Sequence, residues 1–143
     1  MKNLNEYINE GLIKRHAGVD VKAKIEAWLN EHRVVGYIIN DDLTIDVSVG
    51  VDLRNYTEKQ LPDYIQFGKV AGYFDFGKSR NLESLKGCPK AVGGCFGCYE
   101  CSSLKSLEGV PRKVGGSFNC IGCKGDFTPQ DVKKVCKVKI IYC

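Results

Sequence analysis

The stretch Leu85-Lys-Gly-Cys-Pro-Lys-Ala-Val-Gly-Gly-Cys-Phe-Gly-Cys98 recurs 22 residues later as Leu107-Glu-Gly-Val-Pro-Arg-Lys-Val-Gly-Gly-Ser-Phe-Asn-Cys120. A degenerate copy precedes this pair at residues 70–76, an earlier one lies at residues 50–53, and a last one follows at residues 140–142. A unit of this size is too small to close its own hydrophobic core, so each copy must stack on the next. The regular period therefore predicts a solenoid.

The apolar-x-apolar pattern inside each copy predicts a short strand that sends two side chains inward and one outward. The first inward column is predicted to contain Val51, Phe74, Phe96, Phe118 and Ile140. The second is predicted to contain Leu53, Phe76, Cys98, Cys120 and Tyr142. The remaining expected core residues are Leu82, Leu85, Val92, Leu104, Leu107 and Val114. The resulting fold class is α+β, a short leucine-rich-repeat-like parallel β solenoid of about five rungs.

Both ends of the stack are predicted to carry caps, because an uncovered solenoid exposes its core. Residues 1–50 are predicted to form an N-terminal cap, with helices over residues 3–16 and 20–32 and a hairpin of strands 34–39 and 43–49. Ala17-Gly18 is expected to separate the two helices, with Asp20 as the second N-cap. Residues 51–143 are predicted to form the solenoid and its C-terminal cap. That cap combines a short helix, opened by Thr128-Pro129, with a strand over residues 138–142.

The run Leu-Pro-Asp-Tyr-Ile-Gln-Phe-Gly-Lys-Val at residues 61–70, followed by the motif that occurs twice, resembles short leucine-rich-repeat proteins encoded by large tailed bacteriophages. The resemblance covers residues 43–143. It implies a fold and a phage origin, and hence a location in the cytoplasm of an infected host cell, rather than a particular function. In that family the position three residues after the strand cysteine is often an asparagine that forms a side-chain ladder. Here the position holds Ser79, Cys101 and Cys123, which puts the ladder in question.

The N-terminal segment Met1-Lys-Asn-Leu-Asn-Glu-Tyr-Ile-Asn-Glu-Gly11 is similar to the capsid-targeting peptides of tailed phages. The resemblance implies cleavage after the triplet Ile8-Asn9-Glu10, so that residues 1–10 would be processed. A virion-packaged protein is therefore one alternative function, with the virion as a second location. The other interpretation of this segment is an amphipathic helix docked on the repeats.

Composition excludes several classes of protein. The 143 residues include 43% hydrophobic residues and carry a formal net charge of +4. No block of five or more Lys or Arg residues occurs, and no apolar run approaches the roughly 18 residues that span a bilayer. Residues 1–7 lack the apolar segment of a secretory signal. We therefore expect neither a nucleic acid nor a membrane as the partner, and a reducing compartment in which disulfides are uncommon.

All eight cysteines lie at or after Cys88. The pairs Cys98-x-x-Cys101 and Cys120-x-x-Cys123 have the spacing of a four-cysteine zinc site. The two pairs are also one repeat apart, so stacked rungs produce the same spacing without a metal. We expect structural thiols and no cofactor, with a zinc-stabilised structural module as the other alternative.

The only histidines, His16 and His32, are predicted at solvated helix ends, far along the chain from the thiols. A cysteine nucleophile needs a base within hydrogen-bond reach, so we expect no enzyme. Lys133, Lys134, Lys137 and Lys139 form a basic end that a solvated cap face explains, with an acidic partner as the alternative.

Solenoids usually bind their partners on the exposed face of the repeat sheet. Surface tyrosines there have no evident packing reason, which favours an interface role. The sequence therefore predicts a non-enzymatic protein–protein interaction module that binds a host or phage protein. The predicted partner-binding residues are Tyr73, Asp75, Cys95, Tyr99, Ser117, Asn119 and Ile121.

Overall fold

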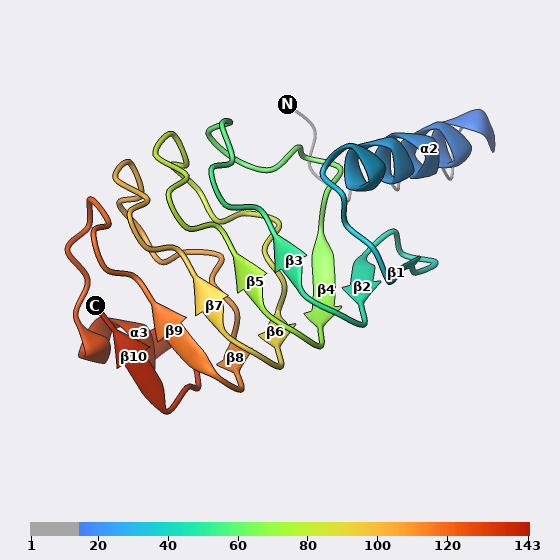
Figure 1. The fold of residues 1–143 in the computed structure, drawn as a ribbon. Helices are drawn as coiled ribbons and strands as arrows, with labels where there is room; N and C mark the ends of the chain where they lie inside the picture. Colours follow the sequence, from blue (N-terminus) through green and yellow to red (C-terminus); the bar gives the residue numbers. More distant parts are fainter. Residues whose placement is uncertain (1–14) are drawn as a thin grey trace.

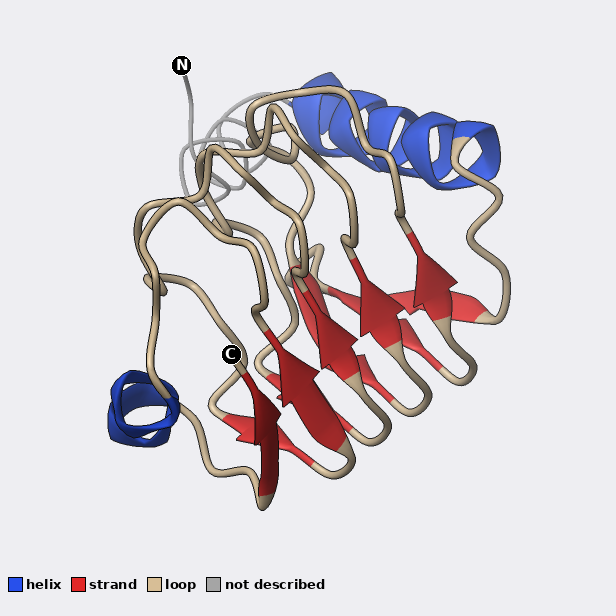
Figure 2. Cartoon of the chain, turned by 60° about the vertical axis from the view of Figure 1, so that its left-hand side comes forward, coloured by secondary structure: helices blue, strands red, loops and turns tan. Residues whose placement is uncertain are grey.

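The computed structural model describes residues 15–143, and its strands wind into a β-solenoid of about four turns (Figure 1). Sheet 1 has the strand order β1-β2-β4-β6-β8, and sheet 2 has the order β10-β9-β7-β5-β3. Figure 2 shows the two sheets as two rows of short arrows that meet along one edge of the molecule. The strands are β1 (Tyr37–Ile39), β2 (Ile45–Val47), β3 (Val51–Asp52), β4 (Phe67–Val70), β5 (Phe74–Asp75), β6 (Ala91–Val92), β7 (Phe96–Gly97), β8 (Lys113–Val114), β9 (Ser117–Asn119) and β10 (Ile140–Tyr142).

Neighbouring parallel strands pair residues that are one repeat apart. In sheet 2, Phe96 lies between Phe74 of the preceding turn and Phe118 of the following one. In sheet 1, Val92 lies opposite Val114 with the same offset. The period read from the sequence is therefore the register of both sheets, and the predicted stacking is confirmed.

The core is a stack of aromatic and aliphatic side chains between the two sheets and the loops. Phe74, Phe96 and Phe118 are all fully buried. The Phe96 ring stacks on Phe74 at a centroid distance of 6.0 Å and lies 5.2 Å from Phe118. The other predicted core residues are also buried: Leu82, Leu85, Val92, Leu104, Leu107 and Val114.

Each complete turn contains two strands, where the sequence indicated one. The second strand of each turn follows a sharp corner after the first, as in Ala91–Val92 and then Phe96–Gly97. Strands of two residues are too short to show an alternating pattern. The sequence therefore predicts Val92 and Val114 as core residues but not as parts of strands. The solenoid has about four turns, where the sequence predicted about five rungs.

The last turn corrects the ends of both predicted columns. In β10 it is Ile141 that pairs with Phe118, while Ile140 pairs with Ser117. Ile140 and Tyr142 are 52% and 51% exposed, so they do not point into the core. The helix inserted before β10 shifts the offset from 22 to 23 residues, which brings Cys143 rather than Tyr142 beside Cys120.

Helix α2 (Arg15–Glu31) corrects the predicted pair of N-terminal helices. It continues through Ala17-Gly18, and Asp20 lies within it instead of capping it. A glycine inside a helix costs only about 1 kcal/mol, which the burial of an apolar stripe outweighs. The stripe consists of Val21, Ile25, Trp28 and Leu29, which are all buried. The remainder of the helix expected over residues 3–16 lies outside the described residues.

The predicted hairpin is confirmed as β1 and β2, with Tyr37 opposite Val47. Strand β2 also pairs in parallel with β4, so the hairpin is continuous with the first turn of the solenoid.

The predicted C-terminal helix is confirmed as α3 (Pro129–Val135). Thr128 is its N-cap, and the Asp131 side chain accepts a hydrogen bond from the Thr128 backbone in a capping box. Val132 is fully buried, whereas Val135 is 46% exposed. Helices α2 and α3 lie at opposite ends of the solenoid (Figures 1 and 2).

Candidate functional site

The outer face of sheet 2 carries three columns of outward positions, because two inward columns alternate with them along each turn. Strand register aligns the members of each column one turn apart. The first column contains Tyr73, Cys95, Ser117 and Ile140. The second contains Asp52, Asp75, Gly97, Asn119 and Tyr142. The third contains Arg54, Gly77, Tyr99 and Ile121.

A groove of about 410 Å³, here called the sheet-2 groove, crosses this grid. Six of the seven predicted partner-binding residues line it: Tyr73, Asp75, Cys95, Tyr99, Ser117 and Asn119. The seventh, Ile121, is 51% exposed and follows Tyr99 in its column, but it does not line the groove. The alternation of the repeat therefore brings together distant residues of three successive turns.

The two groove tyrosines pack against glycines of the preceding turn. A Cβ atom added to Gly50 would overlap the Tyr73 ring, and one added to Gly77 would overlap the Tyr99 ring. The expectation that these tyrosines have no packing reason is therefore wrong, because each ring covers a backbone that lacks a side chain. Tyr73 nevertheless keeps 47% of its surface exposed, and Tyr99 is half-buried. Each ring therefore packs against a glycine of the preceding turn and also lines the groove.

Arg54 is a lining residue that the sequence analysis missed. Its guanidinium donates two hydrogen bonds of 2.9 Å to the Asp52 carboxylate. Hydrogen bonding and charge from Arg54 lower the pKa of Asp52, so the pair stays ionised at neutral pH. The signal for Arg54 was its place 23 residues before Gly77, which puts it in the same column as Tyr99.

The acidic and amide side chains of the groove are oriented by the backbone. The Asp75 carboxylate accepts a hydrogen bond of 2.7 Å from the Gly77 N–H, and the Asn119 amide oxygen accepts one of 3.1 Å from the Ile121 N–H. Burial raises the pKa of Asp75, and the Gly77 N–H opposes this shift.

Cys95 is the exposed free thiol of the groove. Its Sγ accepts hydrogen bonds from the Ser117 hydroxyl at 3.2 Å and from the Ser117 N–H at 3.4 Å. These two bonds lower the pKa of Cys95. No histidine is among the residues that line the groove, and the described His32 contacts Trp28. His32 is half-buried there, with Nδ1 2.9 Å from the Trp28 carbonyl oxygen, instead of being solvated at a helix end.

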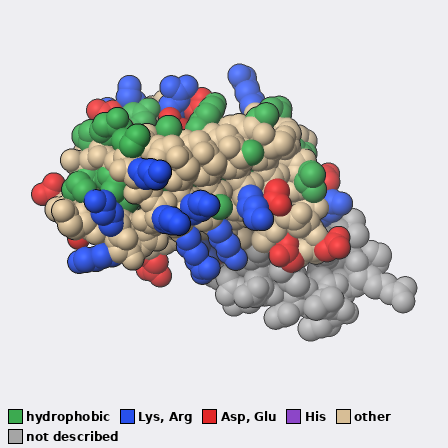
Figure 3. Space-filling model, turned by 90° about the horizontal axis from the view of Figure 1, so that it is seen from below, with side chains coloured by type: hydrophobic (Ala, Val, Ile, Leu, Met, Phe, Trp, Pro, Cys, Tyr) green, Lys and Arg blue, Asp and Glu red, His purple; other side chains and the backbone are tan. Residues whose placement is uncertain are grey.

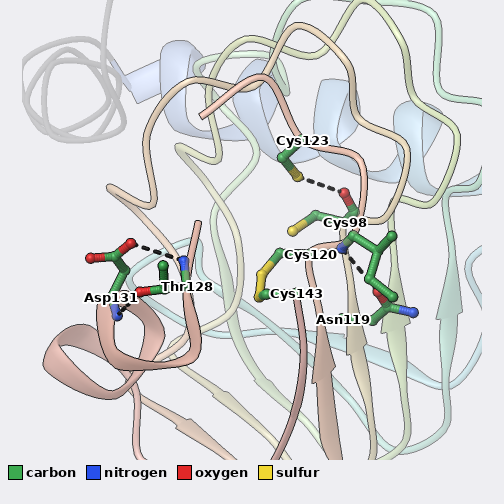
Figure 4. Close-up of a disulfide and its surroundings, with 8 residues drawn as sticks. Cys98, Asn119, Cys120, Cys123, Thr128, Asp131 and Cys143 are labelled. Carbon is green, nitrogen blue, oxygen red and sulfur yellow. Dashed lines mark hydrogen bonds between the residues drawn. A yellow bond between two sulfur atoms is a disulfide. The ribbon is translucent and has the colours of Figure 1, made fainter. Parts of the chain in front are cut away.

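Three of the four cysteines of the candidate zinc site are committed to other interactions. Cys120 forms a disulfide with Cys143, which corrects the expectation of thiols throughout (Figure 4). Cys123 donates to the Cys98 carbonyl oxygen, and Cys101 donates to a carbonyl oxygen of the preceding turn. Within residues 15–143, no group of three or more His, Cys, Asp or Glu side chains is placed to hold a metal ion.

The buried thiols are held in their neutral form. Hydrogen bonding with Cys123, together with burial, raises the pKa of Cys98, and burial raises that of Cys88. Burial also raises the pKa of Cys101 to about 12 and that of Cys136 to about 11. Since the thiolate is the reactive and metal-binding form, these side chains act here as small apolar groups.

No protein-family model matches the chain, and no curated protein or solved structure matches it. None of the helices in the described part of the chain is long and apolar enough to cross a membrane. The segment similar to capsid-targeting peptides, including Ile8-Asn9-Glu10, lies outside the described residues.

Proposed function

We propose that this chain is a non-enzymatic, phage-encoded module that binds a segment of a host or phage protein in the sheet-2 groove. The observation that carries the proposal is the convergence of six outward residues, from three turns of the solenoid, on one groove. Tyrosine and arginine are enriched among the residues that dominate binding energy at protein interfaces, and the groove contains two tyrosines and Arg54.

The groove is also organised before any partner arrives. Tyr73 and Tyr99 are supported by glycine backbones, and Arg54 is held by Asp52. The oxygens of Asp75 and Asn119 are oriented by backbone N–H groups and keep further lone pairs for donors on a partner. Ordering side chains on binding costs about 0.5–1.5 kcal/mol each, so a preformed groove favours affinity.

The surroundings of the Cys95 thiol support a binding role over catalysis. Cys95 has a lowered pKa, but the side chain that contacts it is the neutral Ser117 hydroxyl. A nucleophile of this kind requires a neighbouring group that accepts its proton.

The repeats are proposed to be leucine-rich-repeat-like, with α2 and α3 as the two caps. Trp28 of α2 makes edge contacts with Phe67 and Tyr56, at centroid distances of 6.3 and 6.2 Å. At the other end, Val132 of α3 is fully buried. Covering the terminal repeats in this way keeps a solenoid core from water.

Affinity purification from infected cells followed by titration of the captured protein tests the proposal. The double variant Tyr73→Ala/Tyr99→Ala is expected to weaken binding by about 2 kcal/mol or more. The matched control is Tyr142→Ala, which removes an equally exposed tyrosine of sheet 2 outside the groove. It is expected to bind normally.

A thermal melt accompanies each titration. Because the tyrosine rings cover glycines, the double variant is expected to melt slightly below the wild type but to remain folded. Normal binding by the folded double variant would contradict the proposal and direct attention away from this face.

A further inference from the structure

A second groove, larger than the first, lies on the outer face of sheet 1. It has a volume of about 720 Å³ and runs across the strands from β1 to β8. Most of its lining is apolar, and it includes Ile38, which is 67% exposed, together with Ala71 and Ala91. We call it the sheet-1 groove. Its direction is along the solenoid axis, perpendicular to the strands.

Basic side chains lie in two rows that the register imposes, and two of them, Lys69 and Lys113, line the groove itself. Lys69, Lys113 and Lys137 belong to one row, in which Ala91 occupies the β6 position. Lys90 and Arg112 belong to a second row, which lines a neighbouring pocket, since the Arg112 N–H donates to the Lys90 carbonyl oxygen. All five side chains are exposed. In Figure 3, seen from the edge where the sheets meet, Lys and Arg side chains gather over the middle of the molecule.

These basic side chains lie outside the ion pairs of the described part of the chain. None of the five basic side chains makes an ion pair there, whereas Arg54, Lys59 and Lys86 elsewhere do. One acidic residue, Asp46, lines the groove, and its Oδ1 accepts a hydrogen bond of 2.8 Å from the Lys69 N–H. Like charges side by side on neighbouring strands destabilise a sheet. A negatively charged occupant would relieve that repulsion.

We infer that the sheet-1 groove binds an extended acidic segment of a partner protein, with carboxylates on the lysine rows and apolar side chains over Ile38, Ala71 and Ala91. Strands lie about 4.8 Å apart, so the four spacings from β1 to β8 span about 19 Å. An extended chain rises about 3.3 Å per residue, so about six residues of the partner would fit.

The apolar lining favours a peptide over a nucleic acid. Lysines would attract phosphates equally well, but single strands are held by stacking of bases on aromatic side chains. The sheet-1 groove contains one aromatic residue, Tyr37. In an extended segment with alternating acidic and apolar residues, the acidic side chains on one edge match the row of Lys69 and Lys113, and the apolar side chains on the other edge match the lining around Ala71. This groove lies on sheet 1, and the sheet-2 groove lies on the other sheet.

The test is a titration of the full chain with the labelled peptide Glu-Val-Glu-Val-Glu-Val-Glu at low ionic strength. Controls are the same peptide with Gln in place of Glu, and a single-stranded oligothymidine. We expect the acidic peptide alone to bind, with an affinity that falls as salt is added. Failure of the acidic peptide to bind, equal binding of the Gln peptide, or tighter binding of the oligothymidine would each overturn the inference.

The variant Lys69→Glu/Lys113→Glu is expected to weaken peptide binding at least tenfold. The charge-matched control Lys105→Glu/Lys124→Glu, at two exposed positions outside the groove, is expected to leave it unchanged. The milder Lys69→Gln/Lys113→Gln gives an intermediate loss and shows whether the reversed charges disturb folding. Equal loss in the control variant would also overturn the inference. The variant Tyr73→Ala/Tyr99→Ala should bind the peptide normally, which separates this surface from the sheet-2 groove.

Discussion

The Sγ of Cys123 lies 3.1 Å from the carbonyl oxygen of Cys98, to which it donates a hydrogen bond across one turn of the solenoid. Cys101 makes the equivalent bond to Phe76 at 3.3 Å, and the Ser79 hydroxyl makes it to Leu53 at 3.3 Å. One side-chain donor per turn therefore contacts the backbone of the turn before it. The hydrogen-bonding role that an asparagine ladder would have filled is present here in a ladder of one hydroxyl and two thiols.

The ladder predicts a difference between its members. The Ser79 hydroxyl also accepts a bond of 3.0 Å from the Tyr56 N–H, so Ser79→Ala leaves a buried donor without its partner. Such a loss costs about 1–3 kcal/mol. A thiol is a weaker donor and acceptor than a hydroxyl, so we expect Cys101→Ala to cost less than Ser79→Ala in urea unfolding. The reverse order would mean that packing, rather than hydrogen bonding, determines this position.

Phe96 is the centre of the aromatic stack, in contact with rings on both neighbouring turns. Truncation to alanine leaves a cavity in a core that cannot close around it. We expect Phe96→Ala to lower the free energy of unfolding by about 3–5 kcal/mol. Phe127, a partly buried aromatic at the edge of the core, provides a control that should cost less. Equal effects would contradict a stack that depends on its central ring.

The Cys120–Cys143 disulfide closes a loop with a sequence separation of 23. In the chain-entropy model a loop of this size stabilises a protein by about 3 kcal/mol. Treatment with a reductant should therefore lower the stability of the wild type by about this amount and leave Cys143→Ser unchanged. Thiol titration of the denatured, unreduced protein should detect the six free cysteines. Detection of all eight would show that the bond does not form.

We predict that the contributions of Asp75 and Asp131 to folding stability respond to pH in opposite directions. Burial raises the pKa of Asp75 in the folded state, so the folded protein binds the proton more tightly than the unfolded chain. The stability that this residue contributes is then greatest at low pH and falls as the pH rises from the ordinary value of 3.8 through the folded-state pKa. At neutral pH, Asp75→Asn should melt no lower than the wild type. Any difference in melting temperature between the two proteins should disappear in acid.

Asp131 serves as the control of opposite sign. Hydrogen bonds from the Thr128 backbone and hydroxyl lower its pKa, so its contribution is present above 3.8 and is lost as the pH falls through the folded-state value. Asp131→Asn should therefore melt below the wild type at neutral pH, with a difference that shrinks in acid. Melting curves of both variants across this range measure the two effects, and a lower melting temperature for Asp75→Asn at neutral pH would contradict the assignment.

The features that depend on the repeat period were predictable from the sequence. The Phe74–Phe96–Phe118 column and six of the groove residues follow from alternation at a constant offset. The Cys120–Cys143 pair, which breaks this regularity, was not predictable, because Cys143 reaches Cys120 only after α3 has changed the offset of the last turn.

The other features that the sequence did not predict have a different physical origin. The strand Lys113–Val114 has only two residues, and its role in a second sheet depends on pairing with β6, which local pattern does not reveal. The continuity of α2 through Ala17-Gly18 depends on tertiary packing that outweighs local helix propensity. Disulfide formation likewise requires two sulfurs to meet in space, and composition alone argued against it.

The constant register of the two sheets has a consequence for how such a chain can change its length. An insertion of one residue within a strand would move the later side chains of that strand to the opposite face. Duplication of a whole unit, such as residues 85–106, would instead add one strand to each sheet and leave all existing pairs intact. Both grooves would then lengthen together by about 4.8 Å. Duplication or loss of repeats therefore changes the length of both grooves in steps of one whole repeat.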